Sequence, residues 1–117
     1  MLLDNGTLEE AQVLAPRSVR AMATDQMLPG MRNGVGETAV NNVGYGFGLT
    51  VAVRPSAGGP PILGSAGDFG WGGAYGTTFW VDPQEQLAVV FMAHAPGLRL
   101  RHNQRLVNSL VYQAIMQ

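Results

Sequence analysis

The chain has 117 residues, of which 46% are hydrophobic and 13% are charged. A chain of this length suits one domain and can bury roughly two thirds of the surface that it exposes when unfolded. Its formal net charge is -1 and its basic residues are seven arginines without a cluster, so neither nucleic acid nor an anionic membrane is an expected partner. The absence of cysteine excludes a disulfide framework, a thiol nucleophile and a thiolate metal site.

The first residues carry no recognisable targeting signal. Met1 leads through Leu2 and Leu3 to the turn signal Asn5-Gly6, without the basic flank and long apolar run of a signal peptide. No later apolar run approaches the length that spans a membrane. The sequence therefore leaves the cellular compartment open, and its opening is more typical of the end of a helix than of a beginning.

A short helix and a long loop are predicted before the first strand. Pro16 fits the first turn of a helix, and Val19, Met22 and Ala23 share one face, so we expect a helix over residues 16–26. The following residues, up to about position 42, are rich in glycine and asparagine and have no hydrophobic period. They predict a loop that is long for a compact domain.

Four strands are predicted in the centre of the chain. Bulky and small residues alternate over 43–53, and a second strand resumes at 62–63 and enters a glycine-rich stretch. Residues 75–81 form the third predicted strand. The fourth, 87–93, is apolar without alternation, which predicts that both of its faces are covered. Short connections between these strands favour an antiparallel meander.

The end of the chain predicts an amphipathic helix. Its apolar residues recur as pairs four positions apart, and we expect this stripe to lie against the sheet. The order of helix, loop, four strands and helix predicts an α+β fold, in a single domain over residues 1–117. The stripe consists of Leu106, Val107, Leu110, Val111, Ala114 and Ile115.

The glycine-rich stretch at 64–76 is the strongest candidate for a binding site. Closely spaced glycines weaken a strand, so their use is to let backbone or ligand approach closely. A glycine-lined strand edge bounded by Trp71 and Tyr75 is therefore a plausible place for a substrate. The alternative interpretation is a bulged or twisted core strand whose tryptophans only pack.

Other polar residues give weaker signals. Ser65 lies in a Gly-Ser-Ala-Gly run that is one residue short of a nucleophile elbow, so we expect a turn residue. His94 and His102 have no carboxylate nearby in sequence, and no metal site is predicted. Asp68, among glycines, is more typical of a turn, and Asp82 precedes a proline and is expected to be structural.

Four runs together resemble a known family. They are Tyr-Gly-Phe-Gly-Leu at 45–49, Gly-Asp-Phe-Gly-Trp-Gly-Gly-Ala-Tyr-Gly-Thr at 67–77, Trp-Val-Asp-Pro at 80–83 and Val-Val-Phe-Met at 89–92. In combination they resemble the C-terminal part of the serine β-lactamase-like family. Within that family, the runs most resemble the branch of class C-type β-lactamase homologues that includes the family VIII carboxylesterases.

The resemblance implies a set of site residues. In that family the serine of a Ser-x-x-Lys motif is acylated, the lysine and a Tyr-x-Asn tyrosine move protons, and a strand motif lines the site. The strand motif is Lys-Thr-Gly in β-lactamases and often Trp-Gly-Gly in the esterases, and here it matches Trp71, Gly72 and Gly73. The resemblance further implies that the Ala74 N–H is an oxyanion-hole donor, with Tyr75 beside it.

The sequence also departs from the family pattern. It contains no lysine, and no tyrosine is followed two residues later by asparagine, so the nucleophile motif and the base are missing. The resemblance thus implies the C-terminal fragment of a longer serine hydrolase that cleaves esters or β-lactams without a cofactor or metal, and that is inactive as this chain alone. The alternative is a non-catalytic binding module that uses the Trp71/Tyr75 cleft and forms a homo-oligomer through an exposed sheet edge.

Overall fold

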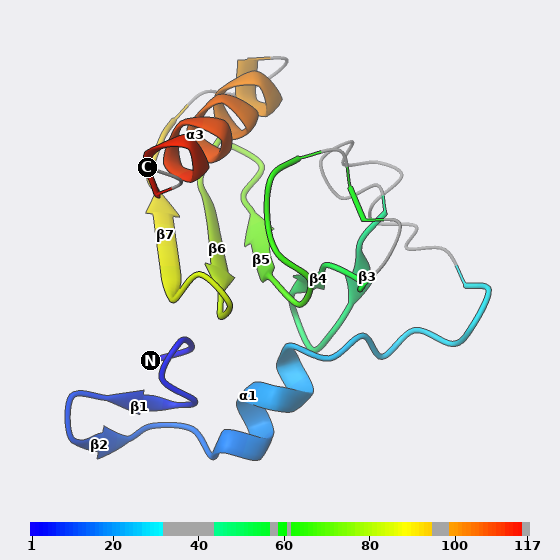
Figure 1. Ribbon diagram of the computed structural model, residues 1–117, viewed down its shortest axis with the longest axis vertical. Helices are drawn as coiled ribbons and strands as arrows, with labels where there is room; N and C mark the ends of the chain where they lie inside the picture. The colour runs from blue at the N-terminus through cyan, green and yellow to red at the C-terminus, as the bar shows by residue number, and fades with distance from the viewer. Residues whose placement is uncertain (32–43, 57–58, 61, 95–98, 116–117) are drawn as a thin grey trace.

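The computed structural model describes residues 1–31, 44–56, 59–60, 62–94 and 99–115 (Figure 1). A small N-terminal hairpin and a short helix precede an antiparallel sheet, and a long helix ends the chain, so the predicted α+β class is confirmed. The elements are β1 (Thr7–Leu8), β2 (Ala11–Gln12), α1 (Pro16–Met22), β3 (Gly46–Phe47), β4 (Ala52–Val53), β5 (Phe69–Gly72), β6 (Thr78–Asp82), β7 (Leu87–Phe91) and α3 (Arg99–Ile115).

The main sheet is an antiparallel meander in the order β3-β4-β5-β6-β7, as predicted, but with five strands instead of four. The prediction of one strand over 43–53 is wrong, because the described part of that range folds back on itself. Phe47 pairs with Ala52, and the Gly48 N–H donates to the Val51 carbonyl. Thr50 has φ 71°, a left-handed conformation that reverses the chain and ends the alternation.

Two further predicted strands differ from the observed ones. The expected strand at 62–63 is not formed, and the glycine-rich stretch pairs only from Phe69 onward. The expected strand at 75–81 begins at Thr78, because the preceding residues form the turn between β5 and β6. The glycine-rich stretch therefore contains β5 itself and the two connections that flank it.

The last strand, β7, is covered on one face only, so the prediction that both faces are covered is wrong. Leu87, Val89 and Phe91 are partly buried, whereas Ala88 and Val90 are exposed. The exposed pair lies on the face opposite α3, since Val90 pairs with Phe79 and the neighbouring Trp80 stacks on Tyr112 of that helix. An unbroken apolar run thus belongs here to an edge strand.

The core lies between the sheet and the N-terminal segment. Its buried members are Val51, Val53, Phe69 and Val81, and partly buried Leu2, Leu3, Ala23 and Phe79 pack against them. The first apolar residues of the chain thus close one end of the core. The first helix ends at Met22 and is therefore shorter than predicted. The Gln26 N–H, which the prediction placed in the helix, donates instead to the Phe47 carbonyl of β3.

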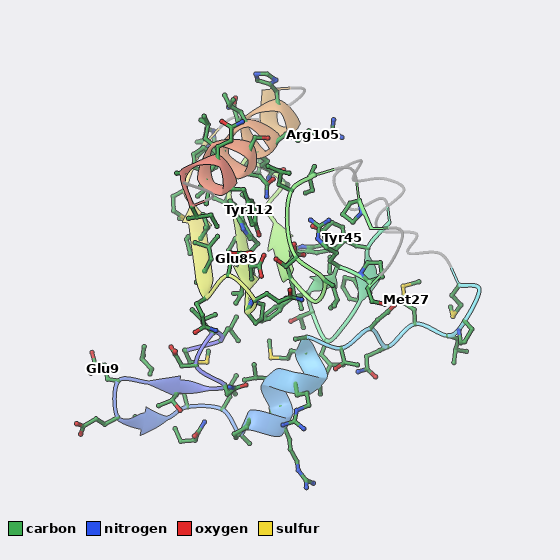
Figure 2. The ribbon with its side chains drawn as sticks, in the orientation of Figure 1. Glu9, Met27, Tyr45, Glu85, Arg105 and Tyr112 are labelled. Atoms are coloured by element: carbon green, nitrogen blue, oxygen red, sulfur yellow. The ribbon has the colours of Figure 1, made fainter. Side chains whose placement is uncertain are left out.

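The last helix, α3, approaches the sheet with polar side chains, so the predicted orientation of its apolar stripe is only partly right. Within the stripe, Val107 and Val111 are partly buried, but Leu106 and Leu110 are exposed, the latter by 54%. Three residues that donate hydrogen bonds to the sheet or to its connections repeat every four positions. They are Gln104, Asn108 and Tyr112, and Figure 2 shows Tyr112 between α3 and the sheet.

None of the helices within the described residues is both long and apolar enough to cross a membrane.

Candidate functional site

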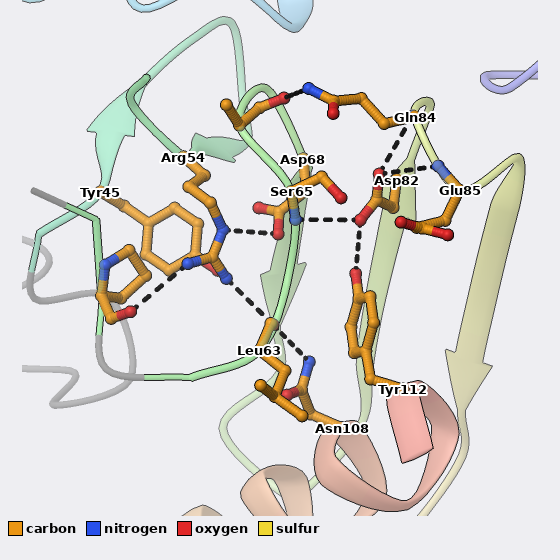
Figure 3. Close-up of polar contacts among 12 residues, drawn as sticks. Tyr45, Arg54, Leu63, Ser65, Asp68, Asp82, Gln84, Glu85, Asn108 and Tyr112 are labelled. Carbon is orange, nitrogen blue, oxygen red and sulfur yellow. Dashed lines mark hydrogen bonds and ion pairs between the residues drawn. The ribbon is translucent and has the colours of Figure 1, made fainter. Parts of the chain in front are cut away.

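Arg54, which follows β4, is the centre of a buried polar network (Figure 3). Its Nε donates to Asp68 Oδ2 at 2.7 Å, and its Nη2 donates to the Leu63 carbonyl at 3.0 Å and the Tyr45 hydroxyl at 3.1 Å. Its Nη1 donates to the Pro60 carbonyl at 3.3 Å, and the guanidinium lies 5.3 Å from the Tyr45 ring centroid. A single arginine therefore fixes the connection that leads into β5.

The backbone repeats this link between β4 and the start of β5. The Arg54 N–H donates to the Asp68 carbonyl at 2.8 Å, and the Gly67 N–H donates to the Arg54 carbonyl at 3.0 Å. At Gly64, φ is 152°, and a Cβ atom would collide with the Asp68 carboxylate and the Arg54 guanidinium. Only glycine leaves room at this position for the buried ion pair.

Asp82, at the end of β6, joins the same connection to α3. Its side chain is fully buried and accepts hydrogen bonds from the Tyr112 hydroxyl at 2.7 Å and the Ser65 N–H at 3.0 Å. The N–H groups of Gln84 and Glu85 also donate to it, at 3.1 and 3.2 Å. Asp82 is structural, as the Asp-Pro sequence predicts, and Ser65 takes part through its backbone.

The two buried carboxyl groups have opposite pKa shifts. Burial raises the pKa of Asp68 to about 6, although the hydrogen bond from Arg54 acts in the other direction. Burial also acts to raise the pKa of Asp82, but hydrogen bonds from Tyr112 and Ser65 outweigh it and hold the pKa below its usual value. Burial raises the pKa of the Tyr112 hydroxyl well above its ordinary value, so at neutral pH it is the donor to an ionised Asp82.

Trp71 lies on β5 and faces away from α3. It pairs with Phe79 across the sheet, and its ring meets the Phe47 ring edge to face, with centroids 5.4 Å apart and planes at 84°. Gly72 is on the opposite face, where a Cβ atom would lie 3.3 Å from Gln104 Nε2 of α3. The partly buried Trp71 thus packs against Phe47 of β3, which lies two strands away from β5 in the sheet.

The turn after β5 exposes main-chain groups. The Gly73 N–H donates to the Thr77 carbonyl at 2.7 Å, and the Gly76 N–H donates to the Gly73 carbonyl at 3.2 Å. Between them, Ala74 is exposed, and its N–H has no hydrogen-bond acceptor within the part of the chain that the structure describes. The two hydrogen bonds on either side of Ala74 fix the position of this exposed N–H.

Tyr75 projects from the same turn and is 61% exposed. Its ring stacks on that of His94, which follows β7, with centroids 5.5 Å apart and planes at 4°. Trp71 and Tyr75 therefore pack against different partners, and a cleft between them stays a prediction. His102 is exposed on α3, and among the described residues no three acidic or histidine side chains gather into a possible metal site.

The sequence interpretation did not single out Arg54, Gln104 or Asn108. One signal for Arg54 was available in the sequence, because a charged residue there directly follows the apolar run 51–53. The amides of Gln104 and Asn108 donate to the carbonyls of Thr77 and Leu63, each at 3.2 Å. Their partners are main-chain groups more than 25 residues away, so no local pattern marks them.

Comparisons with known proteins agree with this architecture. A family model described as Beta-lactamase matches residues 5–112. Protein Rv1367c and the uncharacterized protein MT1414, both of Mycobacterium tuberculosis, are each 38% identical to the chain over 102 residues, which cover 84% of the chain and 25% of the relative. The chain thus spans about a quarter of the length of these curated relatives.

Solved structures share the fold. Unliganded simvastatin synthase (LovD) from Aspergillus terreus, as the selenomethionyl derivative, matches 99% of the chain and 31% of its own length, with TM-score 0.73 and 18% identity. A LovD mutant gives TM-score 0.71 at 18% identity, with the same coverage. At such identity the likeness concerns the fold alone. Since the family match extends over nearly all of the chain, we conclude that the chain belongs to the Beta-lactamase family, as the four sequence runs indicated.

Proposed function

We propose that the chain forms the sheet side of an acyl-transfer site in a β-lactamase-like serine hydrolase, and that the nucleophile and its base come from outside the chain. The observation that carries the proposal is the Ala74 N–H, which follows Trp71-Gly72-Gly73 at the end of β5 and has no acceptor among the described residues. A main-chain donor fixed in this way can stabilise the oxyanion of a tetrahedral intermediate. The loss of one such donor raises the barrier by about 3 kcal/mol.

The neighbouring residues have distinct proposed roles. Trp71 walls the acyl pocket, and Tyr75 borders the leaving-group side. Gly72 and Gly73 keep the strand edge thin, so that a substrate carbonyl can approach the main chain. Gly73 also has a structural role, because a Cβ atom there would collide with Thr77 Oγ1 of the turn that holds Ala74.

The missing parts are the reacting groups. Without lysine the chain has no Ser-x-x-Lys motif, and covalent acyl transfer needs a nucleophile that a neighbouring base activates. The chain alone is therefore proposed to be inactive. The greater length of the relatives, of which it matches about a quarter, supports a division of the site between this segment and another.

The proposed substrate is a neutral ester. Trp71 stands where the β-lactamases of the family have a lysine, so this strand offers no cation to pair with a substrate carboxylate. An ester with a short acyl group needs no such pairing and can use the tryptophan as an apolar wall. A β-lactam remains the second substrate class.

A chimera tests this proposal. Residues 5–112 replace the matching segment of an active esterase of the same family, and hydrolysis of a p-nitrophenyl ester is measured. We expect activity, and we expect Ala74→Pro, which removes the N–H, to lower kcat by about 100- to 1000-fold. Ala74→Ser keeps the N–H and is the matched control. A folded chimera in which Ala74→Pro has the kcat of Ala74→Ser would overturn the proposed donor.

A non-catalytic, self-assembling module is the second candidate function. The observation that favours it is the outer edge of β7, which is apolar and which pairs with no strand within the described residues. Activity of the chimera would support the acyl-transfer site whatever the oligomeric state, so the two candidates are tested separately.

A further inference from the structure

One side chain of α3 reaches the turn that contains Ala74. Gln104 Nε2 donates to the Thr77 carbonyl at 3.2 Å, and the same carbonyl accepts the Gly73 N–H at 2.7 Å. Gln104 is half-buried, and α3 passes the end of the sheet where β5 leads into β6 (Figure 1). The carbonyl that closes the turn is therefore also bound from the helix.

The middle glycine of the Trp-Gly-Gly run leaves room for this contact. A Cβ atom at Gly72 would lie 3.3 Å from Gln104 Nε2 and 3.8 Å from the Thr77 carbonyl oxygen, which are the two atoms that the hydrogen bond joins. A larger side chain at this position would compete with the amide for the same space. Gly72 therefore admits the Gln104 amide to the turn.

The helix that carries Gln104 is held against the sheet by two deeper contacts. The Asn108 amide donates to the Leu63 carbonyl at 3.2 Å, and the Tyr112 hydroxyl donates to Asp82 at 2.7 Å. Both side chains are buried, and residues spaced by four lie on one side of a helix. Gln104 thus extends from a helix whose position relative to the sheet is set by other residues.

The Thr77 carbonyl does not need Gln104 in order to be hydrogen-bonded. A buried carbonyl without a partner is costly, but this one already accepts the shorter bond from Gly73. Removal of the Gln104 amide would leave it with that partner, so little stability depends on the second bond. What the second bond adds is a restriction on where the carbonyl, and with it the turn, can lie.

We propose that Gln104 is a positioning residue, which fixes the turn between β5 and β6 so that the Ala74 N–H is directed at the oxyanion. This inference rests on the acyl-transfer function proposed above. Ala74 directly follows Gly73, whose N–H shares the Thr77 carbonyl with Gln104. A displacement of about 1 Å in an active site can lower the rate by about 100-fold, so a small shift of this turn is enough to affect catalysis.

Kinetics of the chimera that carries residues 5–112 test the proposal. Gln104→Met keeps the length of the side chain and removes its donor. We expect kcat for the p-nitrophenyl ester to fall by about 10-fold and KM to change by less than about 2-fold, as for an interaction that matters only in the transition state. Asn103→Leu removes the neighbouring amide of α3 and is the control, with both constants unchanged.

A double-mutant cycle shows whether Gln104 acts through Ala74. In the Ala74→Pro chimera the N–H is absent, so Gln104→Met should lower kcat by less than about 2-fold in that background. A loss as large as in the parent chimera would overturn the proposal, because the amide would then act independently of the donor. A raised KM with unchanged kcat would also overturn it, since Gln104 would then bind the substrate directly.

Amide hydrogen exchange in the purified chain gives a test that needs no activity. Exchange of the Gly73 N–H should become about 10-fold faster in Gln104→Met, while exchange in β6 stays the same. Gln113→Met makes the same change at an exposed position of α3 and is the matched control. Unchanged exchange at Gly73, or faster exchange throughout the sheet, would overturn the positioning role.

The failure of this inference can be told apart from the failure of the proposed function. An inactive chimera would count against the acyl-transfer site, and hydrogen exchange would still decide whether Gln104 holds the turn. An active chimera whose kcat is lowered by Ala74→Pro but not by Gln104→Met would overturn the role of Gln104 alone.

Discussion

The buried network around Arg54 and the exposed turn that contains Ala74 lie at opposite ends of β5 and differ in how their polar groups are used. The Arg54 side chain donates to four different oxygen atoms, and the Asp82 carboxylate accepts four hydrogen bonds. At the turn, Ala74 is exposed and its N–H has no acceptor within the described residues. The saturated network makes one end of the strand rigid, which is how a scaffold can hold an open site in place at the other end.

The largest expected effect comes from breaking the network at its centre. Arg54→Ala leaves the buried Asp68 carboxylate without its ion-pair partner and removes one of the donors to each of the Pro60 and Leu63 carbonyls. We expect the free energy of unfolding to fall by about 3–5 kcal/mol in urea titrations. Arg17→Ala, on the exposed side of α1, is the control and should change it by less than about 0.5 kcal/mol. Equal effects of the two substitutions would contradict the central role of Arg54.

The next effect is a pH dependence from Asp68. Its pKa is about 6 in the folded chain and 3.8 ordinarily, so between these values the folded state binds more protons than the unfolded state. Stability from this group is therefore present at low pH and is lost as the pH rises through 6, by about 3 kcal/mol at most.

Asp68→Asn removes this titration. The difference in unfolding free energy between the parent chain and the variant should decrease as the pH rises from 4 to 7. Denaturant titrations at several pH values measure the difference. A difference that grows with pH would mean that Arg54 lowers the pKa of Asp68 more than burial raises it.

Two glycines of β5 give a matched pair of substitutions. At Gly70 a Cβ atom would collide with the Phe79 carbonyl and the Trp80 backbone, whereas at Gly72 the nearest atom belongs to the flexible Gln104 side chain. Gly70→Ala should destabilise the chain by about 2 kcal/mol and Gly72→Ala by less than about 1 kcal/mol. Thermal unfolding checks both values. If Gly72→Ala is the worse substitution, Gly72 is needed for folding and its proposed substrate role loses support.

The smallest expected effect is the loss of one hydroxyl. Tyr112→Phe removes the donor at 2.7 Å from the buried Asp82 carboxylate and should cost about 1–2 kcal/mol. Tyr75→Phe, at the exposed turn, should be close to neutral. Chemical denaturation compares the two variants. Equal losses of unfolding free energy would show that the hydroxyl in the buried network stabilises the fold no more than the one at the exposed turn.

The sequence predicted the elements that follow from local patterns. The C-terminal helix and the meander are marked by periodicity and short turns, and both are confirmed. The hairpin between β3 and β4 was missed because alternation over 43–53 has the same appearance in a strand and in a hairpin, and Thr50 gives no sign of its left-handed conformation. The side of α3 that meets the sheet was only partly predicted, because Gln104 and Asn108 donate to main-chain carbonyls in the connections on either side of β5, and a search for apolar periodicity does not detect such donors.

The candidate site was predicted in part. The sequence indicated the stretch from Trp71 to Tyr75, which includes the exposed turn. It did not indicate the Arg54 contacts that fix the connection into β5, because they join residues 6 to 14 positions apart through side chains and carbonyls. Such contacts leave no period in the sequence. The stacking of Tyr75 on His94 likewise depends on two separate connections meeting at one end of the sheet.

The most direct test of the proposed division of the active site is the intact mass of the purified chain after incubation with a fluorophosphonate. The chain has no lysine to activate a serine, so we predict an unchanged mass and no burst of p-nitrophenol from a short acyl ester. A stoichiometric adduct on one of its own serines would contradict this account, because it would place an activated nucleophile within the chain itself.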